Sequence, residues 1–417
     1  MKRESASADA PVPVQPGERI AALDILRAFA LLGILVMNMD AFASTWWVTV
    51  MPEARWPAWY DHAAIFIKET FFDGKFNSLF SLLFGIGFTI QLDRLMARSV
   101  HPIAVYLRRI VILLVIGLLH AFFLWTGDVL HAYAILGIFL VFLRRAPNRL
   151  VIALMVLGLV WPTVRSTWTL YHYTDSDEKA DRAKVEMMQR DTLHAYGQGS
   201  YAEATAMRFR EMKEVYSDPR SLSYFPLFLT TMLLGMYAGR KRIIQDAERQ
   251  RVFIRRVMWW AFAAGMFFAL LVSSLRPLLD PFKPSPLRVL VSTAYGYQRP
   301  ALMLFYACAI VLLSLHARWG RLLAPLRFTG RMPLTNYLMQ SVLCTLIFYG
   351  YGLGFYERVG PALCLGLAFL IFPVQVLTSI WWFRHFRFGP AEWLWRTLTY
   401  GSAPKMLLEP SGSPAAV

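Results

Sequence analysis

The chain reads IAVYLRRIVILLVIGLLHAFFLWTGDVLHAYAILGIFLVFL from Ile103 to Leu143, an apolar stretch that decides the fold. A helix crosses a hydrocarbon core of roughly 30 Å with about 20 apolar residues, and this stretch holds roughly twice that number. The segment Trp125-Thr126-Gly127-Asp128 interrupts it with a glycine and a charge. The stretch therefore predicts a tight hairpin of two membrane helices.

Apolar runs of a similar length recur on both sides of this hairpin. The chain is 57% hydrophobic and 17% charged, whereas ordinary soluble domains carry about 25% charged residues. We therefore predict an all-α, polytopic transmembrane helix bundle of about ten spans. The expected spans are residues 21–43, 76–93, 106–125, 128–143, 150–172, 223–239, 257–275, 298–315, 334–352 and 360–383.

The first of these runs raises a second possibility, because Ala41-Phe42-Ala43 resembles a signal-peptide cleavage site. The run starts late, is long, and carries Asp24 and Arg27 at its head. We interpret it as a retained first helix.

Lys and Arg are distributed unevenly between alternate loops. One set of loops holds 25 of these residues, and the short loops of the other set hold 7. Because positive residues favour cytoplasmic loops, we predict that both termini are cytoplasmic in a multi-pass membrane protein. The net charge of +16 follows from these clusters. Since the chain shows neither a basic soluble domain nor a known binding motif, we expect no nucleic-acid partner.

The domain organisation follows from the spans. A long loop, 173–220, falls outside the membrane, and its pattern predicts two amphipathic helices broken at Gly197 and Gly199. It forms either a solvated cap or a lid over an external site. The predicted parts are a disordered tail 1–18, an N-terminal membrane half 19–172 with an interfacial helix 57–72, the loop 173–220, a C-terminal membrane half 221–401 and a disordered tail 402–417.

The hairpin carries the sharpest group of polar residues at membrane depth. His120 precedes the turn, and Asp128 and His131 follow it, so antiparallel packing places both histidines at a similar depth. A carboxylate beside an imidazole orients the ring and suits a general base. The alternative is a hydrogen-bonded histidine that only packs the helices together.

The first span offers a second group. Asp24 and Arg27 share one helix face, and Asn38 lies fourteen residues beyond Asp24, roughly 21 Å along the axis. The pair either binds a ligand or sits at the cytoplasmic interface without one. Polar groups near both faces of one helix suit a site that is reachable from both sides.

Three further candidates are weaker. Lys75, at the outer mouth of the second span, either neutralises an anionic substrate or anchors the helix among headgroups. Asn336, like Gln340 and Gln375, is expected to hydrogen-bond between helices, and Asn336 is also a candidate substrate contact. The three cysteines lie in apolar runs without a metal-ligand spacing, so no metal is expected.

Several stretches also resemble the YeiB-like family of bacterial inner-membrane proteins, whose C-terminal half is domain of unknown function 418. The resemblance runs from about Arg19 to Gly401. It is carried by LDILRAFALLGILVMNMDAF, DGKFNSLFSLLFGIGF, GLLHAFFLWTGDVLHAYAILGIFLVFLRR, TGRMPLTNYLMQS and, most specifically, FGPAEWLWRTLTYG.

The chain is similar, more remotely, to transmembrane acyltransferases of the heparan-glucosaminide acetyltransferase type. Those enzymes open with Asp-x-x-Arg-Gly and carry an Asn fourteen residues after the Asp, as Asp24, Arg27 and Asn38 do here, with Ala28 in place of the Gly. Their catalytic His lies between the first two helices, where this chain offers only His62.

We therefore expect an acyl-transfer enzyme that takes a cytosolic acyl-CoA as donor and an envelope glycan or lipid as acceptor. His120, oriented by Asp128, would take the acceptor proton, and Asn38 would stabilise the oxyanion. Asp24 and Arg27 would face the donor, and Lys75, His131 and Asn336 would contact the substrates. The alternatives are a transporter of a small anionic solute and a non-catalytic membrane partner. The bilayer is the expected environment, with an oligomer as an open possibility.

Overall fold

A computed structural model describes residues 20–45 and 55–408. The predicted tail 1–18 lies outside these residues. The described part is built from helices, apart from one isolated bridge between Phe386 and Leu407. The helices are α1 (Ala21–Ala43), α4 (Trp59–Phe71), α5 (Lys75–Arg98), α6 (Pro102–Phe123), α7 (Leu130–Leu143), α8 (Asn148–His172), α9 (Asp175–Gly197), α10 (Tyr201–Ser217), α11 (Phe225–Arg240), α12 (Arg251–Leu275), α13 (Pro286–Leu315), α14 (Ala317–Leu323), α15 (Leu326–Arg331), α16 (Pro333–Phe348), α17 (Pro361–Trp382) and α18 (Pro390–Tyr400).

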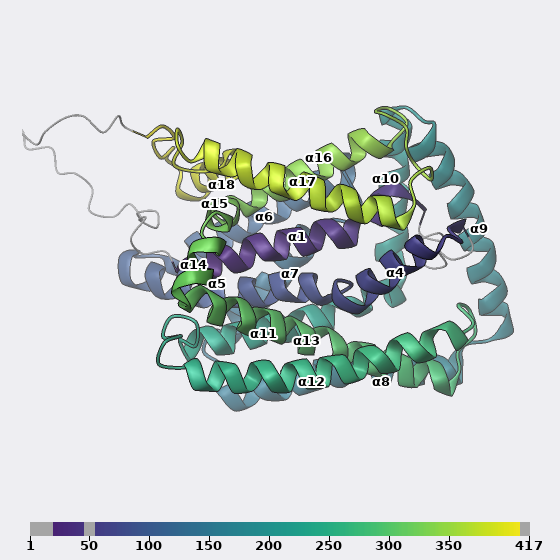
Figure 1. Ribbon diagram of the computed structural model, residues 1–417, viewed down its shortest axis with the longest axis horizontal. Coiled ribbons are helices and arrows are strands. Elements are labelled where there is room, and N and C mark those ends of the chain that lie inside the picture. The colour runs from purple at the N-terminus through teal and green to yellow at the C-terminus, as the bar shows by residue number, and fades with distance from the viewer. Residues whose placement is uncertain (1–19, 46–54, 409–417) are drawn as a thin grey trace, which may run out of the picture.

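Each of the ten predicted spans coincides with a helix, which confirms the all-α prediction. Within the described residues, seven candidate spans are long and apolar enough to cross a bilayer, while α7, α11 and α16 have only 14, 16 and 16 residues. The long helices lie side by side along the longest axis of the molecule (Figure 1). The number of crossings and the cytoplasmic position of both termini stay predictions.

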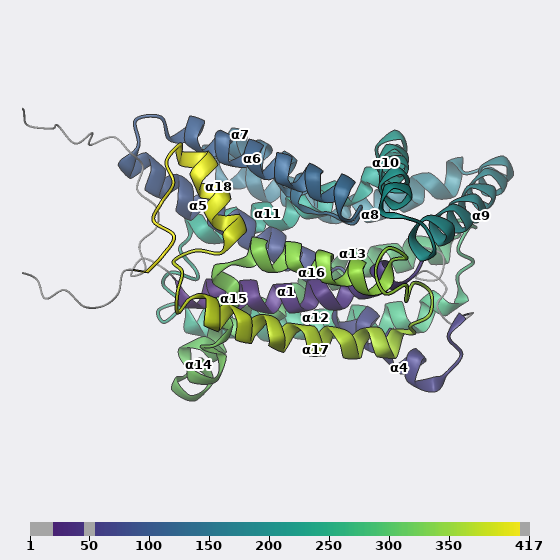
Figure 2. The same ribbon diagram turned by 90° about the horizontal axis from the view of Figure 1, so that it is seen from above.

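The two ends of the bundle differ in structure. The helices α9 and α10, which we call the cap, lie at one end, and α14, α15 and α18 lie at the other (Figures 1 and 2). The cap confirms the two helices predicted for 173–220. Each starts with a reciprocal capping box, Thr174 with Asp177 and Ser200 with Glu203. The opposite end carries the arginine clusters, and we call it the arginine-rich end.

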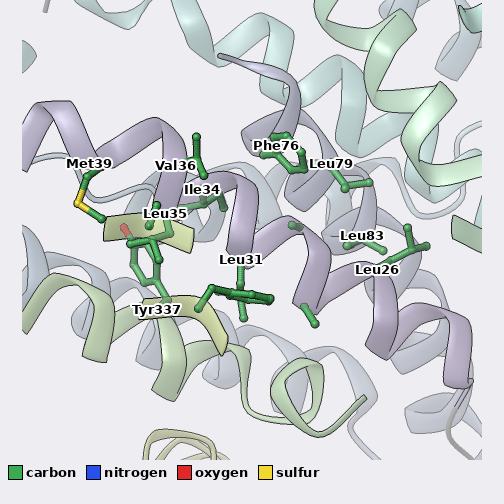
Figure 3. Close-up of a cluster of buried hydrophobic side chains, with 14 of the residues drawn as sticks. Leu26, Leu31, Ile34, Leu35, Val36, Met39, Phe76, Leu79, Leu83 and Tyr337 are labelled. Atoms are coloured by element: carbon green, nitrogen blue, oxygen red, sulfur yellow. The ribbon is translucent and has the colours of Figure 1, made fainter. Parts of the chain in front are cut away.

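Helix α1 is the most enclosed of the candidate spans. In its most apolar window 72% of the residues are buried inside the protein, against 11% in α8. Small residues such as Ala28, Ala30 and Gly33 let its neighbours approach closely. Figure 3 shows Leu31 and Leu35 of α1 beside Tyr337 of α16. The central helix therefore brings elements of both membrane halves together.

The C-terminal residues 402–408, which the sequence assigns to a tail, fold back on the chain. The backbone N–H of Arg387 donates to the carbonyl of Met406, and Trp393 Nε1 donates to the carbonyl of Pro404 at 2.8 Å. Aromatic N–H groups need a partner when they are buried, and this segment supplies one.

The α6–α7 hairpin is closed by a glycine contact. A Cβ added at Gly117 would lie 2.4 Å from the backbone nitrogen of His131. Only glycine allows the two helices to approach this closely, and the approach sets the positions of both hairpin histidines.

We expect Gly117→Ala to destabilise the protein, because the added methyl group forces α6 and α7 apart. Overpacking of this kind costs about 1–3 kcal/mol. Thermal unfolding in detergent should show a lower midpoint. The control is Gly366→Ala on α17, where an added Cβ meets nothing within 4 Å. Equal midpoints for the two variants would contradict the close-contact argument.

Candidate functional site

Asp128 lies in the turn of the hairpin, and both of its carboxylate oxygens accept hydrogen bonds from imidazoles. His120 Nδ1 lies 2.9 Å from Oδ1, and His131 Nδ1 lies 2.6 Å from Oδ2. The backbone N–H of His131 also donates to Oδ2 at 2.9 Å. All three side chains are buried. The predicted juxtaposition of the two histidines and the aspartate is present.

Ser341 of α16 extends this group in a way that the sequence did not reveal. Its Oγ lies 2.8 Å from His120 Nε2. An ionised carboxylate only accepts hydrogen bonds, so Nδ1 of His120 carries the proton and Nε2 accepts from the serine hydroxyl. The result is a buried Ser341–His120–Asp128 relay, which is the arrangement of a nucleophile, a base and the group that orients the base.

A cavity of about 330 Å³ approaches the relay from the arginine-rich end. Its lining on α5 includes both Arg94 and Phe80, which are separated by roughly 21 Å along the helix axis. Its volume falls at the lower end of the range for small-molecule sites, about 300–1,000 Å³. The middle of the wall is apolar, with Leu83, Phe88 and Leu113 among its residues.

The outer part of this cavity is strongly basic. Its lining includes two carboxylates, and each accepts a short hydrogen bond from another group of the protein. Asp24 accepts from Arg27 Nη1 at 2.7 Å, and Glu392 accepts from the backbone N–H of Leu334 at 2.7 Å, at the start of α16. The arginines that line the cavity are Arg27, Arg94, Arg109, Arg331 and Arg396. We call them the arginine rim.

Close packing fixes parts of the rim. The guanidinium of Arg109 stacks on the ring of Trp395 at 3.7 Å. A Cβ at Gly330 would lie 1.7 Å from the carbonyl oxygen of Asp24, so only glycine allows α15 to approach α1 there. This contact places Asp24 and Arg27 on the cavity wall.

Tyr337 closes the inner end of the cavity. It lines the wall together with Val129, which directly follows Asp128. Its hydroxyl lies 3.5 Å from Asp128 Oδ1, and its ring centroid lies 5.1 Å from that of His120. Tyr337 therefore stands between the cavity and the relay.

The other predicted site residues lie elsewhere. Asn38 is half-buried on α1, outside the cavity lining, and makes no side-chain hydrogen bond within the described residues. Lys75 is buried where α4 meets α5 and donates to the Glu69 carbonyl at 2.5 Å. His62 is exposed on α4. The structure does not bring these three residues into contact with the relay, and their proposed roles stay predictions.

Asn336 belongs to a packing network. Its side chain donates to Ser379 Oγ at 3.3 Å, and Gln375 donates to the Asn336 carbonyl at 3.1 Å. Gln340 in turn donates to Gln375 at 2.9 Å. The predicted hydrogen bonds between helices are confirmed here. Among the residues that the structure describes, no group of three or more His, Cys, Asp or Glu side chains is arranged to hold a metal.

The cap is attached directly to the hairpin. Tyr201 Oη and Arg208 Nη1 donate to the carbonyl of Phe123, the last residue of α6, at 2.8 and 3.1 Å. Glu211 accepts from Thr126 in the hairpin turn at 2.7 Å. Tyr216 of α10 lies over His131, with ring centroids 5.9 Å apart. The cap thus covers the relay from the side opposite to the cavity.

Glu211 gives this attachment a pH dependence. Burial raises the pKa of Glu211 above its ordinary value of 4.5, and the bonds from Tyr196 and Thr126 offset only part of this effect. Because the pKa of Glu211 is raised in the folded state, its contribution to the free energy of unfolding is complete below the unfolded-state pKa. That contribution is lost as the pH rises through the folded-state pKa.

We expect Glu211→Gln to be more thermostable than the wild type at pH 8, and to differ little from it at about pH 4. Gln stays neutral and still accepts both hydroxyl bonds. The control is Glu214→Gln, because a hydrogen bond from Lys184 lowers the pKa of Glu214, so that variant should lose stability at pH 8. Melting curves between these pH values test whether each substitution raises or lowers the melting temperature. A Glu211→Gln variant that melts below the wild type at pH 8 would refute this account.

Comparisons with known proteins place these residues in context. The profile of a family described as "Protein of unknown function (DUF418)" matches residues 238–402. The "Uncharacterized protein YxaH" of Bacillus subtilis is 32% identical, over 93% of this chain and 96% of that protein. The "Uncharacterized protein YeiB" of Escherichia coli is 28% identical, over 93% and 97%. An "Uncharacterized 39.9 kDa protein in amylase 3'region" of Bacillus acidopullulyticus is 25% identical, over 95% and 98%.

Proposed function

The chain belongs to the DUF418 family of YeiB-like polytopic membrane proteins, and from this premise we propose that it is a membrane-embedded acyltransferase. The observation that carries the proposal is the cavity, which leads from a rim of arginines through an apolar passage to Tyr337, directly behind which lies the buried relay of Ser341, His120 and Asp128. The donor is an acyl-CoA, and the acceptor is a hydroxyl or amine of an envelope glycan or lipid.

The chemistry of the cavity matches the parts of such a donor. The phosphates bind at the arginine rim, where guanidinium groups make charge-assisted and bidentate hydrogen bonds. The acyl chain and the uncharged arm enter the apolar passage. Tyr106, buried in the cavity wall, has no hydrogen-bond partner for its hydroxyl among the described residues. A polar atom of the arm would satisfy it, since an unpaired buried hydroxyl costs about 1–3 kcal/mol.

The relay supplies the proton transfer. Asp128 holds His120 with the unprotonated Nε2 directed at the Ser341 hydroxyl, where it can accept a proton. The surrounding burial excludes water that would hydrolyse the thioester. The acceptor reaches the relay from beneath the cap, where His131 faces Tyr216. Donor and acceptor thus approach from opposite ends of the bundle.

The same cavity also suits a transporter of a small anionic solute. The arginine rim opens at one end, and Tyr337 with the cap closes the other, as in a carrier that faces one side of the membrane. Consumption of a CoA thioester distinguishes the two functions. An acyltransferase with this relay would consume the thioester, and a carrier would not.

We expect His120→Ala and Asp128→Asn to lower acyl-CoA consumption by purified protein by roughly 10²–10⁴-fold, the range for loss of a general base. Release of free CoA thiol, with acetyl-CoA and octanoyl-CoA as probes, measures this. His62→Ala, at the exposed histidine of α4, should keep the wild-type rate. Flux of an anionic solute into liposomes with no thiol release would support the transporter and refute the enzyme.

Removing charge from the rim should weaken donor binding without abolishing the chemistry. We expect the double variant Arg94→Gln/Arg396→Gln to bind acetyl-CoA roughly tenfold more weakly or worse, since tenfold corresponds to about 1.4 kcal/mol. Equilibrium dialysis at two salt concentrations measures the affinity. Arg249→Gln, at an exposed arginine outside the cavity lining, is the control. Equal affinities for all three proteins would contradict a donor site at the rim.

A further inference from the structure

We infer that Ser341 is the nucleophile of the reaction, and that transfer passes through an acyl ester on its side chain. This inference rests on the proposed function and deepens it, since a direct transfer from donor to acceptor would need only His120 and Asp128.

The hydroxyl of Ser341 has a different kind of hydrogen-bond partner from the hydroxyls of other buried serines in this protein. Ser78 donates to the carbonyl of Gly74, and Ser379 donates to that of Gln375, each four residues back in its own helix. This local bond is the usual way for a helical serine to satisfy its hydroxyl. Ser341 bonds instead to His120 on another helix, 221 residues away in the sequence.

The relay prepares this hydroxyl for attack. Asp128 is held at Oδ2 by the side chain and the backbone of His131, so Oδ1 stays directed at His120 Nδ1. His120 then has one lone pair, at Nε2, and the Ser341 hydroxyl is bound to it at 2.8 Å. A nucleophile, a base within hydrogen-bond reach and a third group that orients the base are the signature of an activated serine.

The position of Ser341 also suits a donor in the cavity. Ser341 lies four residues after Tyr337 on α16, so both occupy the same face of that helix. Tyr337 closes the inner end of the cavity. A shift of the Tyr337 side chain would place a thioester at the end of the apolar passage next to Ser341 Oγ.

The steps balance with the donor and acceptor already named. Ser341 Oγ gives its proton to His120 Nε2 and bonds to the thioester carbon. The carbon–sulfur bond breaks, and the thiolate takes the proton from His120 to leave as free CoA thiol. The acceptor hydroxyl or amine then gives a proton to His120 and attacks the ester carbon, and Ser341 Oγ recovers the proton as it leaves.

The test is a covalent adduct in the full-length protein. Wild-type protein is incubated with acetyl-CoA or octanoyl-CoA without acceptor, quenched in acid and analysed by intact mass and peptide mapping. We expect one acyl group on the peptide that contains Ser341, sensitive to hydroxylamine, and a burst of thiol release that matches the enzyme concentration. Ser341→Ala should form no adduct and should lower thiol release by roughly a thousandfold or more.

Two further variants separate chemistry from folding. Ser341→Cys should form a thioester adduct at the same position, and Ser78→Ala, a buried serine with only a local bond, should behave like the wild type. Donor binding by Ser341→Ala, measured by equilibrium dialysis, shows that the variant is folded.

The outcomes distinguish this inference from the function on which it rests. Wild-type turnover without an adduct, or full turnover by Ser341→Ala, would overturn the serine nucleophile and leave a direct acyltransferase. Absence of both donor binding and thiol release in the wild type would overturn the acyltransferase itself, and the nucleophile with it.

Discussion

A single buried carboxylate organises the centre of this protein. Asp128 lies away from water, where an ionised group at membrane depth costs roughly 2.5–3.5 kcal/mol by insertion scales. Two imidazoles and one backbone N–H satisfy its two oxygens. Removing a partner from such a buried charge is costly, about 3–5 kcal/mol where it has been measured in other proteins. The requirement to satisfy Asp128 therefore fixes the turn, both hairpin histidines and, through His120, helix α16.

The charged, apolar and polar groups of the cavity and the relay lie at successive positions along the bundle. Charge is concentrated at the arginine rim. The apolar passage follows, and the polar relay lies beyond Tyr337. The relay is thus buried inside the protein, and the arginines line the part of the cavity that is farther from it. Helix α1 lies between the two membrane halves, and its small residues let both contribute to one wall.

The sequence predicted the local features of the site well. The hairpin, the two cap helices and the pairing of Asp128 with His120 and His131 follow from apolar run length, glycine positions and residue spacing. These are contacts within a few tens of residues, which periodicity and turn signals record directly. Asn336 and its amide neighbours were also predictable as packing groups, because a buried amide in a membrane helix needs a partner.

Ser341 and the cavity were not predictable from the same signals. The bond between Ser341 and His120 joins residues 221 positions apart, and no spacing in the sequence records it. The family profile covers residues 238–402 and so contains Ser341 but neither His120 nor Asp128. Asn38 shows the opposite case. A spacing shared with transmembrane acyltransferases of the heparan-glucosaminide acetyltransferase type suggested it, and the structure places it outside the relay and the cavity lining. The burial of Lys75 at the α4–α5 junction was not predictable either, because it involves a distant helix, with Tyr295 of α13 next to the Lys75 ammonium. Its role as a substrate contact stays a prediction.

The attachment of the cap has a consequence for how the chain is made. The carbonyl of Phe123 ends α6, and its hydrogen-bond donors are Tyr201 and Arg208, which lie 78 and 85 residues later in the chain. Because synthesis runs from the N-terminus, the hairpin is made before the two residues that complete its hydrogen bonding. The carbonyl at the end of α6 lacks both donors until the cap has been made and has folded back onto the hairpin. Folding of the cap and completion of the hairpin are thus coupled.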